Sequence, residues 1–197
     1  MTDRYPEFYK DNPMRDKGDE AEAIVEKWYK GMSSVDRVKR LTQDWDNQDA
    51  EIDFTVYLKG GGKTSVEVKS DKHLGVRNKN VLFEFTRVYN TDFHPFRLAW
   101  GPKSKADEFV FYASKPKHLY VYNVKKLNTE IAKIIHDIGK SDKKYKEKTA
   151  EIKAMVDVVI TDKAKITFNL LVPEVLLKSI TTKYNLNAQN QYQAIKC

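Results

Sequence analysis

Hydrophobic and polar residues alternate one by one along residues 52–58 and again along residues 64–70. This period of two predicts a pair of β-strands, each with one apolar and one polar face. Both strands place their large apolar residues at even positions, so Asp53, Glu67 and Lys69 share the opposite face. The segment KGGGK between the strands predicts a tight turn, because glycine adopts positive φ without steric cost. Residues 52–70 are therefore predicted to form a β-hairpin.

The rest of the chain mixes helical and strand patterns. Apolar residues recur at helical spacing from Gly18 to the residue before Gly31, and again over 127–138. Residues 34–50 lack a clean period and predict a loop or a short strand, and a turn-rich loop is predicted from Tyr89 to Lys105. Further strands are predicted at 80–88, 106–114, 118–124 and 165–172, and a short helix at 173–180. This order favours an α/β fold around a mixed sheet.

Changes in composition predict three regions. Residues 1–17 are polar and read as a loosely packed arm, and residues 18–139 hold the predicted core. Residues 140–197 are a C-terminal extension that we expect to pack on the same domain. It opens with a highly charged stretch, interpreted as a solvated helix or a linker, and its polar tail after Tyr184 is expected to fray.

The chain of 197 residues carries a net charge of +7, which favours a polyanionic partner such as nucleic acid. No apolar stretch is long enough to span a bilayer, and the polar N-terminus lacks the apolar core of a signal peptide. The single cysteine is Cys197, so no disulfide can form within the chain. These features predict a soluble protein of the cytoplasm, with no membrane partner.

The glycines of the turn raise the question of a phosphate-binding loop, whose pattern is G-x-x-x-x-G-K-[ST] before a helix. Lys63 follows Gly62, but Tyr57 stands where the first glycine would be needed. The residues after Lys63 also have the period of a strand. The glycines are therefore interpreted as the hairpin turn alone.

Pairing the hairpin around Gly61 predicts that Asp53 faces Lys69 and that Thr55 faces Glu67. Two carboxylates then lie close enough to repel, unless a cation sits between them. Their oxygens suit Mg²⁺ or Mn²⁺. A metal there can polarise a phosphoryl group, and Lys69 can position water or neutralise developing charge. An ordinary solvent-facing strand with an Asp–Lys pair remains the alternative.

Asp53, followed along the chain by Glu67-Val68-Lys69, resembles the D…(D/E)-x-K signature of the PD-(D/E)xK nuclease superfamily. The helix that opens with KGDEAE resembles the first helix of archaeal-type Holliday junction resolvases, whose acid would be Glu22, with Glu20 as the alternative. Residues 80–112 resemble small phage and bacterial nucleases of the superfamily. One departure is Ile52, which stands where many members have proline. The resemblance implies a restriction-endonuclease-like αβββαβ core, with a mixed central sheet flanked by helices.

The resemblance also implies roles for individual residues. Asp53 and Glu67 would bind Mg²⁺ or Mn²⁺ together with the Val68 carbonyl, and Glu22 would contact a second metal or a metal-bound water. Lys69 would assist the attacking water. Glu84, in the strand at 80–88, either reaches this site or is an exposed strand acid.

Four basic residues near the predicted site are candidates for phosphate contacts, although each is also explained as an ordinary solvated charge. They are Arg77, Lys79, Lys103 and Lys105. The resulting hypothesis is a Mg²⁺-dependent deoxyribonuclease of phage or bacterial type, which acts on DNA as an endonuclease and can form a homodimer. The alternatives are a non-catalytic nucleic-acid-binding protein on the same scaffold and a phage assembly or interaction protein.

Overall fold

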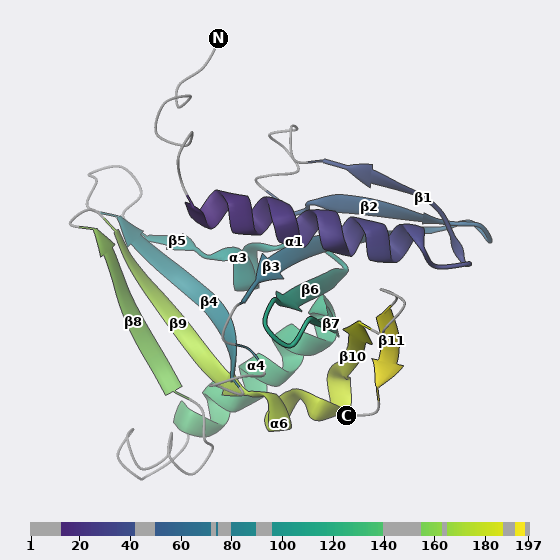
Figure 1. Cartoon of the computed structure of the whole chain (residues 1–197). Coiled ribbons are helices and arrows are strands. Elements are labelled where there is room, and N and C mark those ends of the chain that lie inside the picture. The colour runs from purple at the N-terminus through teal and green to yellow at the C-terminus, as the bar shows by residue number, and fades with distance from the viewer. Residues whose placement is uncertain are drawn as a thin grey trace.

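The computed structural model describes residues 13–41, 50–71, 74, 80–89, 96–139, 155–162, 165–186 and 192–195. Over these residues the chain folds as a mixed α/β protein with two sheets, and helices flank the central sheet (Figure 1). The predicted α/β class with a mixed central sheet is confirmed. Among the described residues, no helix is long and apolar enough to cross a membrane.

The central sheet has seven strands in the order β1-β2-β3-β6-β7-β10-β11. Strands β3 and β6 run parallel, and every other neighbouring pair in this sheet is antiparallel. Their bounds are β1 Val35–Arg40, β2 Phe54–Leu58, β3 Lys63–Ser70, β6 Glu108–Ala113, β7 His118–Asn123, β10 Thr181–Leu186 and β11 Tyr192–Ile195. Strand β1 lies in the segment for which the sequence predicts a loop or a short strand.

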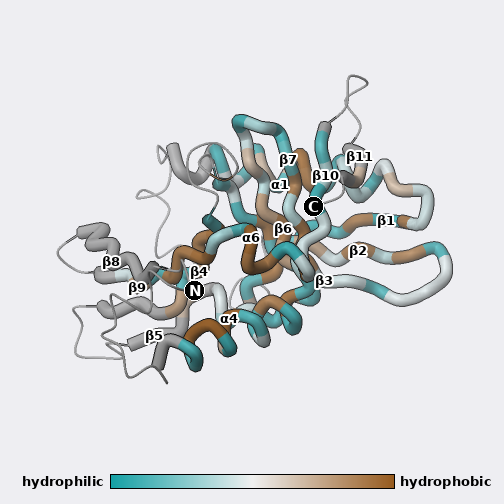
Figure 2. The backbone as a smooth tube through the Cα atoms, turned by 90° about the horizontal axis from the view of Figure 1, so that it is seen from below, coloured by the Kyte–Doolittle hydropathy of each residue, from teal (hydrophilic) through white to brown (hydrophobic). Residues whose placement is uncertain are grey.

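Two helices cover opposite faces of this sheet (Figure 1). Helix α1, Pro13–Lys30, packs on even-numbered residues of β2 and β3 in one apolar cluster. Helix α4, Val124–Gly139, packs in a second cluster with Phe109, whereas the next residue, Val110, belongs to the cluster under α1. Figure 2 shows these apolar segments in brown along the tube. The sheet is thus the middle layer between two cores.

A four-stranded sheet, with the order β5-β4-β9-β8, lies beside the central sheet. Its strands are β4 Asn80–Tyr89, β5 Phe96–Leu98, β8 Met155–Asp162 and β9 Lys165–Pro173. The strand predicted at 80–88 therefore belongs to a different sheet from the hairpin, because it pairs with β9 and not with β3. The loop predicted from Tyr89 to Lys105 is also wrong in its second half, which contains β5 and the short helix α3, Trp100–Lys103.

Both long helices begin earlier than the sequence predicts. Helix α1 starts at Pro13 and not at Gly18, so the expected arm over residues 1–17 is too long. Proline suits a first helical position because its ring fixes a helical φ and its missing N–H is not needed there. Helix α4 starts at Val124 because the Asn123 Oδ1 accepts a hydrogen bond from the Lys126 N–H at 3.0 Å, which caps the helix.

The C-terminal extension adds strands to both sheets. Strand β9 pairs with β4, and β10 pairs with β7 after the short helices α6, Glu174–Leu177, and η1, Lys178–Ile180. The expected fraying after Tyr184 is wrong for β10 and β11, since Tyr184 packs against Trp28 with ring centroids 4.8 Å apart. The charged stretch at 140–154 lies outside the described residues.

Candidate active site

The β2–β3 hairpin brings the predicted acids together, but in a register two residues away from the predicted one. Thr55 pairs with Ser65 and not with Glu67. The difference arises in the turn, where Gly61 and Gly62 adopt φ values of 85° and 89° and the loop closes around Gly60. A shift of two residues preserves the faces of both strands, so Asp53 remains on the side of the sheet that carries Glu67.

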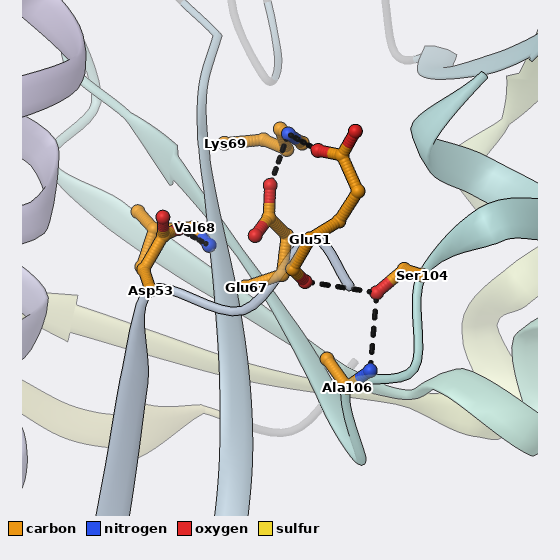
Figure 3. Close-up of polar contacts among 7 residues, drawn as sticks. All are labelled: Glu51, Asp53, Glu67, Val68, Lys69, Ser104 and Ala106. Carbon is orange, nitrogen blue, oxygen red and sulfur yellow. Dashed lines mark hydrogen bonds and ion pairs between the residues drawn. The ribbon is translucent and has the colours of Figure 1, made fainter. Parts of the chain in front are cut away.

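Asp53 lies one residue before β2 and is tied to β3 by two hydrogen bonds. Its N–H donates to the Val66 carbonyl at 2.9 Å, and its Oδ2 accepts from the Val68 N–H at 2.7 Å (Figure 3). The N–H and C=O of a strand residue point to the same edge, so the Val68 carbonyl also faces the end of β2. The backbone of the Glu67-Val68-Lys69 motif thus holds the Asp53 carboxylate in place.

Glu67 and Lys69 extend from β3 on the face opposite to α1. Glu67 is 3% exposed and its Oε1 forms an ion pair with the Lys69 Nζ. Lys69 also lies 3.7 Å from the Glu51 Oε2, so it sits between two carboxylates (Figure 3). Lys69 therefore neutralises part of the negative charge that the fold gathers here.

Sequence reasoning missed Glu51, although an acid two residues before Asp53 could have signalled it. Glu51 adopts a positive φ of 53°, and the Ser104 Oγ donates a hydrogen bond to its carbonyl at 3.1 Å. The Ala106 N–H donates in turn to the Ser104 Oγ, also at 3.1 Å (Figure 3). The segment after α3 thus positions Glu51 beside Lys69.

Glu22 approaches the site from α1. Its Oε2 lies 3.7 Å from the Arg40 guanidinium of β1. Burial raises the pKa of Glu22, and Arg40 opposes this rise while Asp19 and Glu67 add to it. Glu22 also adds to the raised pKa of Asp53, whereas Glu20 is exposed. Of the two helix acids that the sequence offered, the electrostatics of the site favour Glu22.

The carboxylates of the site are strongly perturbed. Burial, reinforced by Glu22, raises the pKa of Asp53 to about 6, although the Val68 N–H and Lys69 favour its ionised form. Burial likewise raises the pKa of Glu67 to about 8, against the pull of Lys69. Burial alone would lower the pKa of Lys69, but Glu67 and Glu51 together raise it. Four carboxyl groups, those of Glu22, Glu51, Asp53 and Glu67, therefore share this site with the cations of Lys69 and Arg40.

The oxygen atoms at the site are of the chemical type that binds hard divalent cations. Two carboxylates, Asp53 and Glu67, lie beside the Val68 carbonyl, and oxygen ligands of this type suit Mg²⁺ or Mn²⁺. Over the part of the chain that the structure describes, no three His, Cys, Asp or Glu side chains are grouped tightly enough to form a metal site as they stand. The metal remains a prediction that rests on the type of donor atom and on the number of carboxyl groups gathered at the site.

Glu84 does not lie in the sheet that carries the hairpin. It is on β4 of the four-stranded sheet and is 9% exposed, so its interpretation as an exposed strand acid is wrong. On this strand Val81 and Phe83 are each 1% exposed, whereas Phe85 is 39% exposed because the pairing with β9 shifts after Glu84. That Glu84 reaches the site remains a prediction.

The four basic candidates for phosphate contacts have different outcomes. Arg77 and Lys79 lie outside the described residues. Lys103 ends α3, which Gly101 anchors against β4: a Cβ at Gly101 would lie 2.5 Å from the Phe83 ring. Lys105 is exposed, and its N–H donates to the Ala50 carbonyl at 2.9 Å, next to Glu51. Lys103 and Lys105 therefore flank the segment that supports the site.

The chain has little similarity to known proteins. No family model and no curated protein matches the sequence. A solved structure of a bacterial homing endonuclease, I-Ssp6803I, is similar over 60% of this chain and 74% of that chain, with 19% sequence identity and a TM-score of 0.44. This similarity is too low to assign a function, so the function has to be argued from the residues of the site.

Proposed function

We propose that the protein is a Mg²⁺- or Mn²⁺-dependent nuclease of the PD-(D/E)xK type that hydrolyses phosphodiester bonds in DNA. The observation that carries the proposal is the hydrogen bond from the Val68 N–H to the Asp53 carboxylate. This bond holds Asp53 against the Glu67-Val68-Lys69 motif. Asp53 immediately precedes β2 and Glu67 lies on β3, so the two acids come from the two arms of the hairpin. The perturbed pKa values of Asp53 and Glu67 are of the kind that clusters at catalytic sites.

In this proposal Asp53, Glu67 and the Val68 carbonyl would hold the cation, and Glu22 on α1 acts electrostatically on Asp53. When bound, the cation would polarise the phosphoryl group and lower the pKa of a bound water. The protein contributes the fixed position of these oxygen ligands. The Val68 N–H orients Asp53, and the surrounding residues leave only 3% of Glu67 exposed. Such fixed donors need little rearrangement when negative charge develops at the phosphate.

Lys69 is the group best placed to act on the phosphate or on the attacking water. Its ammonium lies next to Glu67 and 3.7 Å from Glu51, and its side chain is 24% exposed. The raised pKa of Lys69 keeps it protonated at neutral pH. Lys69 therefore donates hydrogen bonds and offsets the charge that builds on the phosphate oxygens, and Glu51 helps to orient it.

The test is cleavage of double-stranded, single-stranded and branched DNA with Mg²⁺, using the full chain. We expect Glu67→Gln and Lys69→Met each to lower the rate by about 10³-fold or more, because these groups act mainly in the transition state. Glu130→Gln is the matched control, since Glu130 pairs with Lys133 on α4, away from the hairpin. Its rate should equal that of the unsubstituted protein.

Three results would contradict the proposal. Glu67→Gln and Lys69→Met variants that cut as fast as the unsubstituted protein would exclude the assigned site. Salt-sensitive DNA binding without Mg²⁺-dependent cutting would indicate a binding protein on this scaffold. Calorimetry that detects no Mn²⁺ binding would favour an assembly or interaction protein.

A further inference from the structure

The face of β1, β2 and β3 that points away from α1 carries a group of polar and basic side chains. Cross-strand pairing places Arg37 beside Tyr57 and Lys39 beside Thr55, and then Tyr57 beside Lys63 and Thr55 beside Ser65. The intervening residues of these strands, including Val56 and Val66, lie in the cluster under α1. Because side chains alternate between faces, the polar set shares its face with Glu67 and Lys69. We call Arg37, Lys39, Tyr57 and Lys63 the hairpin surface.

The hairpin surface is open, unlike the same face of the neighbouring strands. Arg37, Lys39 and Lys63 are exposed, and Tyr57 is half-buried. Further along this face, residues of β6 and β7 such as Phe109 and Tyr120 are buried in the cluster that contains α4 residues. The covered part of the face ends next to the candidate site, and the open part begins there.

The charge on the hairpin surface is positive. Arg37, Lys39 and Lys63 contribute three cations. Asp36 directly precedes Arg37 at the irregularity of β1, and Asp107 is hydrogen-bonded to Ser65. That carboxylate already accepts hydrogen bonds from the Ser65 N–H at 2.8 Å and the Ser65 Oγ at 2.7 Å. A cationic surface next to a cluster of acids can hold a polyanion that the acids alone would repel.

Arg37 is held in position by an aromatic ring. Its guanidinium lies 4.3 Å from the centroid of the Tyr57 ring on the adjacent strand. A cation–π contact of this kind limits the freedom of the side chain and leaves the edge of the guanidinium able to donate hydrogen bonds. The planar array of donors on arginine matches phosphate oxygens.

The spacing along β3 connects the hairpin surface to the site. Lys63 and Glu67 lie four residues apart on one strand, or roughly 13 Å at about 3.3 Å per residue. Along the axis of a duplex, one DNA strand advances about 3.4 Å per nucleotide, so this distance corresponds to the axial rise of roughly four nucleotides. A backbone that lies on the hairpin surface can therefore continue to Glu67 along the same face.

We propose that the hairpin surface binds the phosphate backbone of DNA on one side of the bond that is cut. This inference rests on the proposed nuclease function and identifies where the substrate extends beyond the acids. Arg37, Lys39 and Lys63 contact phosphates, and Tyr57 positions Arg37. None of these four residues is needed for the chemistry at Asp53 and Glu67.

The experiment measures binding of the full chain to a 30-base-pair DNA duplex by fluorescence anisotropy, in EDTA and over a series of salt concentrations. We expect the Arg37→Gln/Lys39→Gln/Lys63→Gln variant to bind at least 10-fold more weakly at low salt. The slope of log K against log salt should fall in magnitude by about 2.7, because each neutralised phosphate contributes about 0.9 to the slope. All three positions are exposed, so the melting temperature should not change.

The matched control is Lys27→Gln/Lys115→Gln/Lys178→Gln, which removes the same charge from α1, the β6–β7 turn and η1. This variant should keep the slope of the unsubstituted protein. Equal slopes for the two triple variants would contradict the proposal that the hairpin surface binds DNA. Mg²⁺-dependent cutting by the unsubstituted protein would still support the nuclease function. A protein that neither binds nor cuts DNA would overturn both proposals.

Discussion

The two faces of β3 are both buried, but they bury opposite kinds of side chain. Val66 is 0% exposed and packs in the apolar cluster under α1, whereas its neighbour Glu67 is 3% exposed on the other face beside Lys69. Burial of the valines is favourable, by about 25 cal/mol for each Å² of apolar surface removed from water. Burial of the ions is costly, and their mutual attraction does not fully offset that cost. One strand thus separates a stabilising face from a face that we assign to chemistry.

Asp53 connects the two faces. Its carboxylate accepts a hydrogen bond from the backbone of Val68, whose side chain is 8% exposed under α1. The packing of Val68 therefore fixes the N–H that orients Asp53. The apolar face supports the charged one through the backbone, so the two faces should respond to substitution in different ways.

The largest expected effect is on activity alone. In the Glu67→Gln/Lys69→Met variant, cleavage should fall by about 10³-fold or more, which corresponds to about 4 kcal/mol of transition-state stabilisation. The free energy of unfolding should stay the same or rise, because removing both members of a buried ion pair also removes their desolvation cost. Single-turnover cleavage and urea denaturation measure the two quantities. A loss of stability above about 2 kcal/mol would show that the ion pair supports the fold.

The next effect is on stability alone. Phe54 is 0% exposed under α1, next to Asp53 in the sequence, and Phe54→Ala should lower the free energy of unfolding by about 3–5 kcal/mol. Leu58→Ala is the control on the same strand. Leu58 is 38% exposed, so this substitution should lower the free energy of unfolding much less. At a temperature where the variant is folded, its cleavage rate should stay within several-fold of the original. If Phe54→Ala lowered the cleavage rate as much as Glu67→Gln, the two faces of β3 would not act independently.

The sequence predicted this division because alternation is a local property. The period of two in residues 52–58 and 64–70 placed Asp53, Glu67 and Lys69 on one face, and the turn at Gly61 and Gly62 followed from glycine alone. The predicted register was wrong by two residues. The register depends on which glycines take positive φ, and a run of three equivalent glycines does not specify that.

Other features depend on contacts between residues that are distant in the sequence. Strand β4 pairs with β9, so that Asn80 faces Pro173, and no local pattern reports such a pairing. Glu51 joins the site because its backbone adopts a positive φ and Ser104 binds its carbonyl. The assignment of 80–88 to the core sheet and the omission of Glu51 have this common physical cause.

A smaller effect should appear in the pH dependence of stability. The pKa of Asp53 is raised to about 6, so the folded protein binds this proton more tightly than the unfolded chain does. Its contribution to stability is present below the unfolded pKa of about 3.9 and is lost as pH rises through about 6. The loss should be on the order of 2–3 kcal/mol, at about 1.4 kcal/mol per pH unit. Glu67, with a raised pKa of about 8, should extend the fall to higher pH.

Comparison with Asp53→Asn isolates this effect, because the variant should lack the Asp53 part of the slope between pH 4 and pH 6 in thermal or urea unfolding. Millimolar Mg²⁺ should restore stability at pH 8 in the unsubstituted protein and not in Asp53→Asn, since a bound cation favours the ionised carboxylates. Parallel curves for both proteins would show that burial of Asp53 carries no cost.

The smallest effect tests a polar contact on the apolar face. Tyr29, 5% exposed on α1, donates a hydrogen bond from its hydroxyl to the Glu108 Oε2 of β6 at 2.6 Å. Burial and this carboxylate raise the pKa of Tyr29, so its hydroxyl stays protonated and keeps donating. Tyr29→Phe should lower the free energy of unfolding by about 1.5–3 kcal/mol, as expected for a bond to a charged group.

Glu108→Gln provides the comparison for Tyr29→Phe, because the amide oxygen still accepts the hydroxyl and the loss should be smaller. Glu108 is paired with Val66 in the sheet, one residue from Glu67, so it lies close to the site along the backbone but on the opposite face. If the faces act separately, Tyr29→Phe leaves the rate of cleavage and its Mg²⁺ dependence unchanged. A changed Mg²⁺ dependence would show instead that α1 sets the position of β3 through Glu108, and that the packing of the apolar face affects the proposed site on the other.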